Sequence, residues 1–83
     1  FSLHYHMIKD ESWIVTAGSF KLRWIDTKTA EHHYETLNTG DTWRNPPGMP
    51  HQVEALEDMS SIMEVSTADS TEDNYRIEFG SSA

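Results

Sequence analysis

Four side chains have the types and the spacing of ligands for one metal ion. His4 and His6 are two residues apart, and such residues project from the same face of a β-strand, so both imidazoles can point at one place. Glu11 opens the next strand pattern, and its carboxylate can reach that place across a hairpin. His51 follows directly after a proline-rich loop. Three imidazoles and a carboxylate suit zinc, manganese, iron, nickel or copper, and an octahedral ion keeps positions open to water or substrate.

Each of these residues also has an ordinary structural interpretation. A single His-x-His pattern on a strand is more often a solvated or cross-strand paired face than a metal site, because short motifs specify function only loosely. Glu11 alone could be a solvated charge at a strand edge, and His51 could be an ordinary turn residue. The joint spacing of the four residues, and not any one of them, favours a metal site.

The elements that must position these side chains are β-strands. Short runs rich in β-branched and aromatic residues alternate with Gly, Pro, Asn and Asp, and no segment has a sustained helical period. This pattern is typical of an all-β sandwich or barrel. Residues 46–50 include three prolines and are expected to form a rigid loop, because proline has no N–H for a ladder. Strands are predicted near residues 2–7, 11–17, 19–26, 31–37, 42–45, 51–55, 61–66 and 75–78.

A chain of 83 residues has room for one domain with a modest core. We expect this domain to span residues 1–79, with a loop or a short helical turn at 68–73 and a frayed tail at 80–83. The sequence has no cysteine, so extra stability must come from a metal ion or from a partner subunit and not from a disulfide. A homodimer is therefore predicted, which would also cover exposed strand edges.

The first half of the sequence resembles the first motif of the cupin superfamily. That motif is His-x-His, three or four residues, Glu, six residues and Gly, and it is matched here by His4, His6, Glu11 and Gly18. The glycine that precedes the motif in the family would lie upstream of Phe1. All three ligand positions of the motif are present.

The second cupin motif also has a counterpart. It is Gly, five residues, Pro-x-Gly, two residues, His, three residues and Asn, and it is matched by Gly40, Pro46, Gly48 and His51. Ala55 stands at the final Asn position, and this departure removes no ligand. Two motifs in the right order make the resemblance specific, and it covers most of the chain up to about residue 66.

The resemblance implies an all-β double-stranded β-helix, a jelly-roll barrel of six to eight strands that holds one divalent metal ion in its mouth with the four ligands. A finer resemblance rests on short blocks at residues 4–6, 11–15, 64–67 and 73–78. These blocks are similar to the cupin domain of mannose-6-phosphate isomerase type proteins, a branch that often has a basic or polar pocket for a sugar phosphate. This finer resemblance implies a sugar phosphate as one ligand class.

Four further residues are candidates for lesser roles. Arg44 lies on the strand that leads into the proline-rich loop and is the basic residue best placed to bind an anionic ligand, with an outward salt bridge as the alternative. Glu64 could line the ligand pocket or be solvated. His32 and His33 are adjacent, so on a strand they face opposite sides and cannot both bind one metal ion.

The charge balance restricts the partners. Six basic residues against fourteen acidic ones give a formal charge of -8, which argues against nucleic acid and against an anionic membrane surface. No apolar run reaches the roughly 20 residues that span a bilayer, and a cytoplasmic protein is expected.

We therefore predict a metal-binding protein for a small polar or anionic ligand, such as a sugar phosphate or an organic acid. If the reaction is an isomerisation, Glu11, Glu64 or a metal-bound hydroxide is the candidate base, and no residue is assigned as catalytic. The alternatives are an Fe(II)-dependent dioxygenase, and a non-enzymatic binding or sensor module with a structural metal.

Overall fold

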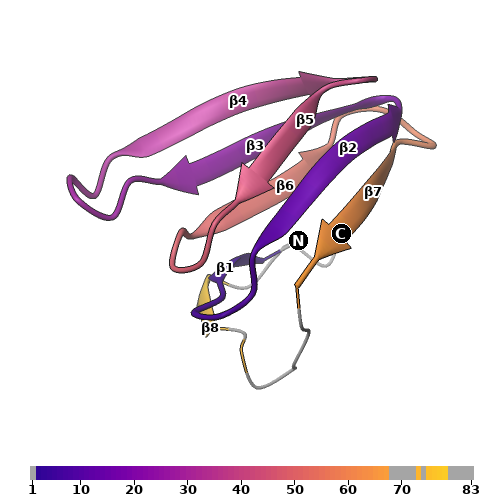
Figure 1. Ribbon diagram of the computed structural model, residues 1–83. Helices are drawn as coiled ribbons and strands as arrows, with labels where there is room; N and C mark the ends of the chain where they lie inside the picture. Colours follow the sequence, from indigo (N-terminus) through magenta and orange to yellow (C-terminus); the bar gives the residue numbers. More distant parts are fainter. Residues whose placement is uncertain (1, 68–72, 74, 79–83) are drawn as a thin grey trace.

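The structure, a computed structural model, describes residues 2–67, 73 and 75–78. These residues form eight strands (Figure 1). No helix among them is long and apolar enough to cross a lipid bilayer. The strands are β1 (Leu3–Tyr5), β2 (Glu11–Ala17), β3 (Ser19–Ile25), β4 (His32–Asn38), β5 (Thr42–Asn45), β6 (His51–Ala55), β7 (Ser61–Ser66) and β8 (Tyr75–Glu78).

The predicted all-β fold is confirmed. Five strands have the bounds expected from the sequence, namely β2, β5, β6, β7 and β8. Strand β3 ends one residue earlier than predicted, and β4 begins and ends one residue later. Strand β1 is shorter than the predicted range 2–7, because it spans only Leu3–Tyr5. Residues 68–72 of the expected loop and residues 80–83 of the expected tail lie outside the described residues.

The strands form two antiparallel sheets that face each other (Figure 1). The larger sheet has five strands in the order β4-β3-β6-β1-β8, and the smaller has three in the order β5-β2-β7. Strands β1 and β2 follow each other in the sequence but belong to different sheets. This arrangement is that of a double-stranded β-helix, in which the two sheets enclose the core between them.

The prediction that Glu11 reaches the histidines across a hairpin is wrong. Strand β1 pairs with β6 and β8, whereas β2 pairs with β5 and β7. The connection over residues 6–10 crosses from the larger sheet to the smaller one. Its ends are held by backbone hydrogen bonds from Gly48 N–H to the His6 carbonyl and from Thr67 N–H to the Asp10 carbonyl. Glu11 consequently faces β1 and β6 from the opposite sheet.

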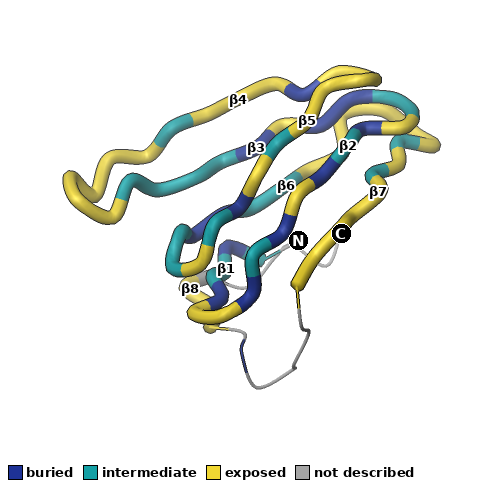
Figure 2. Tube along the Cα trace, in the orientation of Figure 1, coloured by how far each residue is buried: buried dark blue, intermediate teal, exposed yellow. Residues whose placement is uncertain are grey.

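The core lies between the sheets and follows the alternation of the strands (Figure 2). On β2, Glu11, Trp13 and Val15 are buried, whereas the residues between them are less so. The apolar cluster between the sheets consists of Trp13, Val15, Phe20, Leu22 and Leu37, with Trp24, Trp43, Val53 and Ile62 packed against it. Because side chains two apart share a face, the alternation that buries Trp13 and Val15 also turns Glu11 inward.

Gly18 joins β2 to β3 at a position that no other residue fits. Its φ is +69°, in the left-handed region, and a Cβ there would lie 2.0 Å from Oγ and 2.9 Å from Cα of Ser60. Gly40 has a similar conformation, with φ +92°, but a Cβ there would meet nothing within 4 Å. A comparison of alanine substitutions at the two glycines therefore distinguishes the cost of a left-handed backbone from the cost of a steric conflict.

We predict that Gly18→Ala destabilises the protein more than Gly40→Ala does. Gly40→Ala carries only the left-handed strain of about 1 kcal/mol. Gly18→Ala adds the conflict with Ser60 and should cost about 3 kcal/mol in the free energy of unfolding. Urea denaturation of both variants measures the difference, and equal destabilisation would contradict the steric argument.

Both sheets have strand edges that no described segment covers. In the smaller sheet β7 lies at one edge, and its Met63 and Val65 are 55% and 69% exposed. In the larger sheet β4 and β8 are the outer strands. Uncovered edges and exposed apolar side chains favour association between copies of a small domain.

The homodimer stays a prediction, and light scattering at tens of micromolar tests it. We expect twice the mass of the chain, because pairing through an edge strand would satisfy its unpaired backbone groups. A monomer at that concentration would contradict the prediction.

Candidate metal centre

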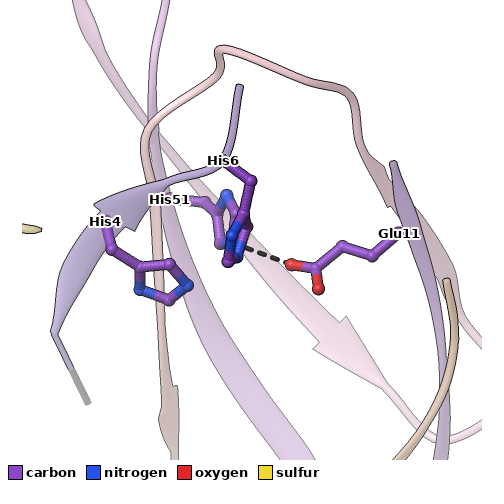
Figure 3. A group of neighbouring side chains, drawn as sticks. All are labelled: His4, His6, Glu11 and His51. Atoms are coloured by element: carbon purple, nitrogen blue, oxygen red, sulfur yellow. Dashed lines mark ion pairs between the residues drawn. The ribbon is translucent and has the colours of Figure 1, made fainter. Parts of the chain in front are cut away.

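The structure brings His4, His6, Glu11 and His51 together (Figure 3). One nitrogen or oxygen atom of each residue can be chosen so that all four atoms lie within 4.8 Å of one another. His6, Glu11 and His51 are buried, and His4 is partly buried. The two sheets supply the group jointly, because His4 and His51 lie on the larger sheet and Glu11 begins β2 of the smaller one.

Strand register explains the positions of His4 and His51. The two residues are direct partners across β1 and β6, so their side chains project from the same face of the sheet. Their rings are 4.6 Å apart between centroids and roughly edge to face. The rigid loop that was expected at residues 46–50 precedes β6 and places His51 at its first position.

His6 is positioned differently from His4, because β1 ends at Tyr5. The His6 carbonyl accepts a hydrogen bond from Gly48 N–H, and its ring contacts the backbone carbonyl of Asp73. His6 thus reaches the group from the connection between the sheets and not from a regular strand. The expected same-face projection of the two histidines is achieved through loop contacts.

All three imidazoles have the same orientation with respect to the backbone. Nδ1 of His4 is 3.0 Å from the Ser2 carbonyl, and Nδ1 of His51 is 3.0 Å from the Met49 carbonyl. Nδ1 of His6 contacts the Asp73 carbonyl. A carbonyl oxygen only accepts hydrogen bonds, so each Nδ1 carries a proton, and in the neutral imidazole the lone pair is then on Nε2. Metal-binding histidines are oriented in this way.

One close contact inside the group joins a nitrogen of His51 to an oxygen of Glu11. Nε2 of His51 is 2.9 Å from Oε1 of Glu11, and the exposed fractions of these side chains are 2% and 4%. His51 Nε2 is buried without a hydrogen-bond partner among the described residues. The contact is satisfied in either of two ways: a second proton on Nε2 makes His51 and Glu11 an ion pair, or a metal ion lies between the Nε2 lone pair and the carboxylate oxygen. A divalent cation fits this donor set.

Two neighbours hold the Glu11 carboxylate. Asn45 Nδ2 is 3.3 Å from Glu11 Oε1, and Asn45 Oδ1 accepts a hydrogen bond of 2.9 Å from Trp43 Nε1. On the other oxygen, Lys9 Nζ is 3.4 Å from Glu11 Oε2. These contacts fix which oxygen of Glu11 faces the imidazoles.

The pKa values of the two neighbouring carboxyl groups move in opposite directions. Burial raises the pKa of Glu11, but hydrogen bonds with His51 and Glu64 and the charges of His51 and Lys9 outweigh it, so the net pKa is well below its usual range. The hydrogen bond to Glu11 raises the pKa of Glu64, and burial adds to this. Burial also lowers the pKa of His4. Glu11 is therefore an ionised ligand beside a neutral His4.

Asp73 connects the C-terminal part of the chain to the group. Its carboxylate accepts hydrogen bonds from the backbone N–H groups of Met7, Ile8 and Lys9, at 2.8, 3.1 and 2.9 Å. Burial raises the pKa of Asp73, but the three N–H groups and the charge of His6 together lower it below its usual range. One residue thus holds both the His6 ring and the loop that leads to Glu11.

The structure does not bring Arg44 to the group. Arg44 alternates with the buried Asn45 and therefore points to the outer face, where its guanidinium binds both carboxylate oxygens of Asp10, at 3.1 and 2.6 Å. Its side chain is 62% exposed. Arg44 therefore forms an outward salt bridge, which was the alternative interpretation from the sequence.

The remaining sequence candidates have clear positions. Glu64 borders the group, since its Oε1 is 3.4 Å from Lys9 Nζ, and its side chain is 43% exposed. His33 stacks on Trp24 with 4.4 Å between ring centroids, whereas His32 is exposed. The two histidines therefore face opposite sides, as expected, and neither belongs to the group.

Sequence reasoning missed Lys9, Asn45 and Asp73. Asn45 pairs with Glu11 across β2 and β5, so the register of those strands could have revealed it. Lys9 and Asp73 act from irregular segments, and Asp73 is 64 residues from Lys9 along the chain. No local pattern indicates such contacts.

Comparison with known families identifies the class of protein. The family model for cupins matches residues 1–82, so the chain belongs to the cupin family. The expected superfamily is therefore confirmed. A search of curated proteins gave no match.

Solved structures with the same fold are known. One is oxalate decarboxylase from Bacillus subtilis, with a TM-score of 0.78 and 25% identity over 92% of this chain and 20% of that one. Another is CapF, a capsular polysaccharide assembling protein from Staphylococcus aureus, with a TM-score of 0.76 and 20% identity over 95% of this chain and 23% of that one. The chain spans about a fifth to a quarter of the length of these proteins.

We predict that Asp73→Ala weakens metal binding about 10-fold or more, because the backbone N–H groups of Met7, Ile8 and Lys9 lose their acceptor and no longer hold the loop between His6 and Glu11. Asp58→Ala, the same charge change at an exposed position, serves as the control. Isothermal titration with Mn²⁺ measures both.

Since the pKa of Asp73 is lowered, its stabilising effect is present above the ordinary Asp value of about 3.9 and is lost as the pH falls further. The difference in Tm between wild type and Asp73→Ala should therefore shrink in acid. Equal Mn²⁺ affinity in all three proteins would contradict the role of Asp73.

Proposed function

We propose that this cupin binds one divalent metal ion through His4, His6, Glu11 and His51 and holds a small anionic ligand at it. The observation that carries the proposal is the common orientation of the three imidazoles, whose Nδ1 atoms all contact backbone carbonyls. This orientation leaves three nitrogen lone pairs and one ionised carboxylate directed at one place. Zinc, manganese, iron, nickel and copper all accept such a donor set.

The bound metal would supply a Lewis acid and a template for ligand oxygens. The protein's own residues orient the group: the carbonyls of Ser2, Met49 and Asp73 hold the rings, and Asn45 holds Glu11. The surrounding apolar core excludes water from the inner side. The resulting site is rigid before any ligand arrives.

Two basic residues support an anionic ligand. Lys9 lies beside Glu11, and Arg76 is the partner of His4 across β1 and β8, so it projects from the same face of the sheet as His4. Arg44, the base favoured from the sequence, points away. The ligand contact that we first assigned to Arg44 is therefore reassigned to this pair.

A small carboxylate is the favoured ligand class. The oxalate decarboxylase with the same fold is named for such a compound. A sugar phosphate remains the second class, from the resemblance to mannose-6-phosphate isomerase type proteins, and CapF is named for polysaccharide assembly. If the chain is an enzyme, Glu64 is the carboxyl group best placed to exchange a proton with a ligand, because it borders the group and is partly exposed. We also propose a cytoplasmic location.

We predict that the wild type binds one Mn²⁺ per chain and then oxalate, and that His51→Ala binds Mn²⁺ at least about 100-fold more weakly, because it loses one of the four metal ligands. His32→Ala is the matched control, since His32 is exposed and lies on β4, which is separated from the His51 strand by β3. Metal analysis and isothermal titration measure both steps.

Arg44→Ala should bind oxalate as the wild type does, because Arg44 lies on the outer face. Titration with mannose 6-phosphate in parallel separates the two ligand classes. A wild type that binds no divalent metal would overturn the proposal, as would equal binding by His51→Ala.

A further inference from the structure

The two oxygens of the Glu11 carboxylate have different partners. Oε1 faces the imidazoles, 2.9 Å from His51 Nε2, and Asn45 Nδ2 is 3.3 Å from it. Oε2 faces Lys9, whose Nζ is 3.4 Å away. A carboxylate can bind a metal ion through one oxygen or through both, and these partners distinguish the oxygens before a metal is present.

Lys9 is built into this position. Its side chain is only 10% exposed, and its ammonium also lies 3.4 Å from Glu64 Oε1, so two carboxylates compensate the buried charge. Its backbone N–H donates to Asp73 Oδ2 at 2.9 Å, which fixes the point from which the side chain extends. Burial of a lysine is unfavourable unless the charge is paired, so this ammonium stays beside the carboxylates.

We propose that Lys9 is a positioning residue that restricts Glu11 to one-oxygen coordination and thereby keeps two coordination positions of the metal ion open for a chelating anion. The inference rests on the proposed metal binding and specifies its ligand as an anion with two donor oxygens. Three nitrogens and one oxygen occupy four positions of an octahedral ion such as Mn²⁺. If Glu11 turned both oxygens to the metal, only one position would remain.

Lys9→Met tests the proposal, because methionine fills a similar volume without the charge. Lys28→Met is the control, since Lys28 lies in the exposed turn between β3 and β4 and gives the same change in net charge. Lys9→Arg should restore the wild-type behaviour, because arginine keeps a cation beside Oε2. The probes are Mn²⁺, malonate, which needs two neighbouring positions, and acetate, which needs one.

We expect the wild type and Lys28→Met to retain two exchangeable waters on Mn²⁺, measured by ¹⁷O-water electron–nuclear double resonance, and Lys9→Met to retain one. The ratio of malonate affinity to acetate affinity should fall about 10-fold or more in Lys9→Met, a change typical of residues that orient a metal ligand. Mn²⁺ affinity should not fall, because the variant removes a positive charge near the cation and offers a second oxygen.

Three results would overturn the inference: an unchanged water count and affinity ratio in Lys9→Met, a loss of Mn²⁺ affinity in that variant, or a single exchangeable water in the wild type. The last result applies even if Lys9→Met fails to fold. A wild type that binds no Mn²⁺ would instead contradict the proposed function, so the two failures can be told apart.

Discussion

The contact between His51 and Glu11 is the constraint on which the site depends. The nitrogen comes from one sheet and the oxygen from the other, both are buried, and both are acceptors when the His51 proton is on Nδ1. Two acceptors 2.9 Å apart in a region of low dielectric repel each other unless a proton or a metal ion lies between them. The charge that satisfies them also ties the two sheets together at one end of the core. In the proposed function, metal binding and the link between the two sheets therefore depend on the same atoms.

This sharing explains how a small domain keeps a polar cluster next to its core. Trp13 packs against the His51 ring with 5.6 Å between centroids, and Trp43 donates to Asn45, which in turn donates to Glu11. Aromatic side chains thus provide both apolar area and hydrogen bonds that orient the ligands. The buried Asn45 is paired on both sides in this way, which limits the cost of its burial.

Much of this arrangement could be predicted from the sequence because it follows from strand periodicity. The eight strands, the inward position of Glu11 and the convergence of His4 with His51 depend on alternation and on two motifs with defined spacing. Arg44 was the open case, because its face depends on the parity of β5, and the buried Asn45 beside it settles that parity. The hairpin expected between β1 and β2 was wrong because adjacency along the chain does not determine which sheet a strand joins. The role of Asp73 could not be predicted, since it depends on a contact between irregular segments.

The position of Asp73 in the chain has a consequence for the order of folding events. The hydrogen bonds from Met7, Ile8 and Lys9 to its carboxylate join residues 64 to 67 positions apart, together with the His6 contact to its carbonyl. Closing loops of this length is slow compared with forming local turns, and topologies rich in distant contacts fold slowly. During synthesis, the His4 and His6 segment is made more than 60 residues before Asp73, so these contacts cannot form until the chain has been made as far as Asp73. Completion of the candidate metal site is therefore among the late folding events, because it requires the contacts that Asp73 makes with His6 and Lys9.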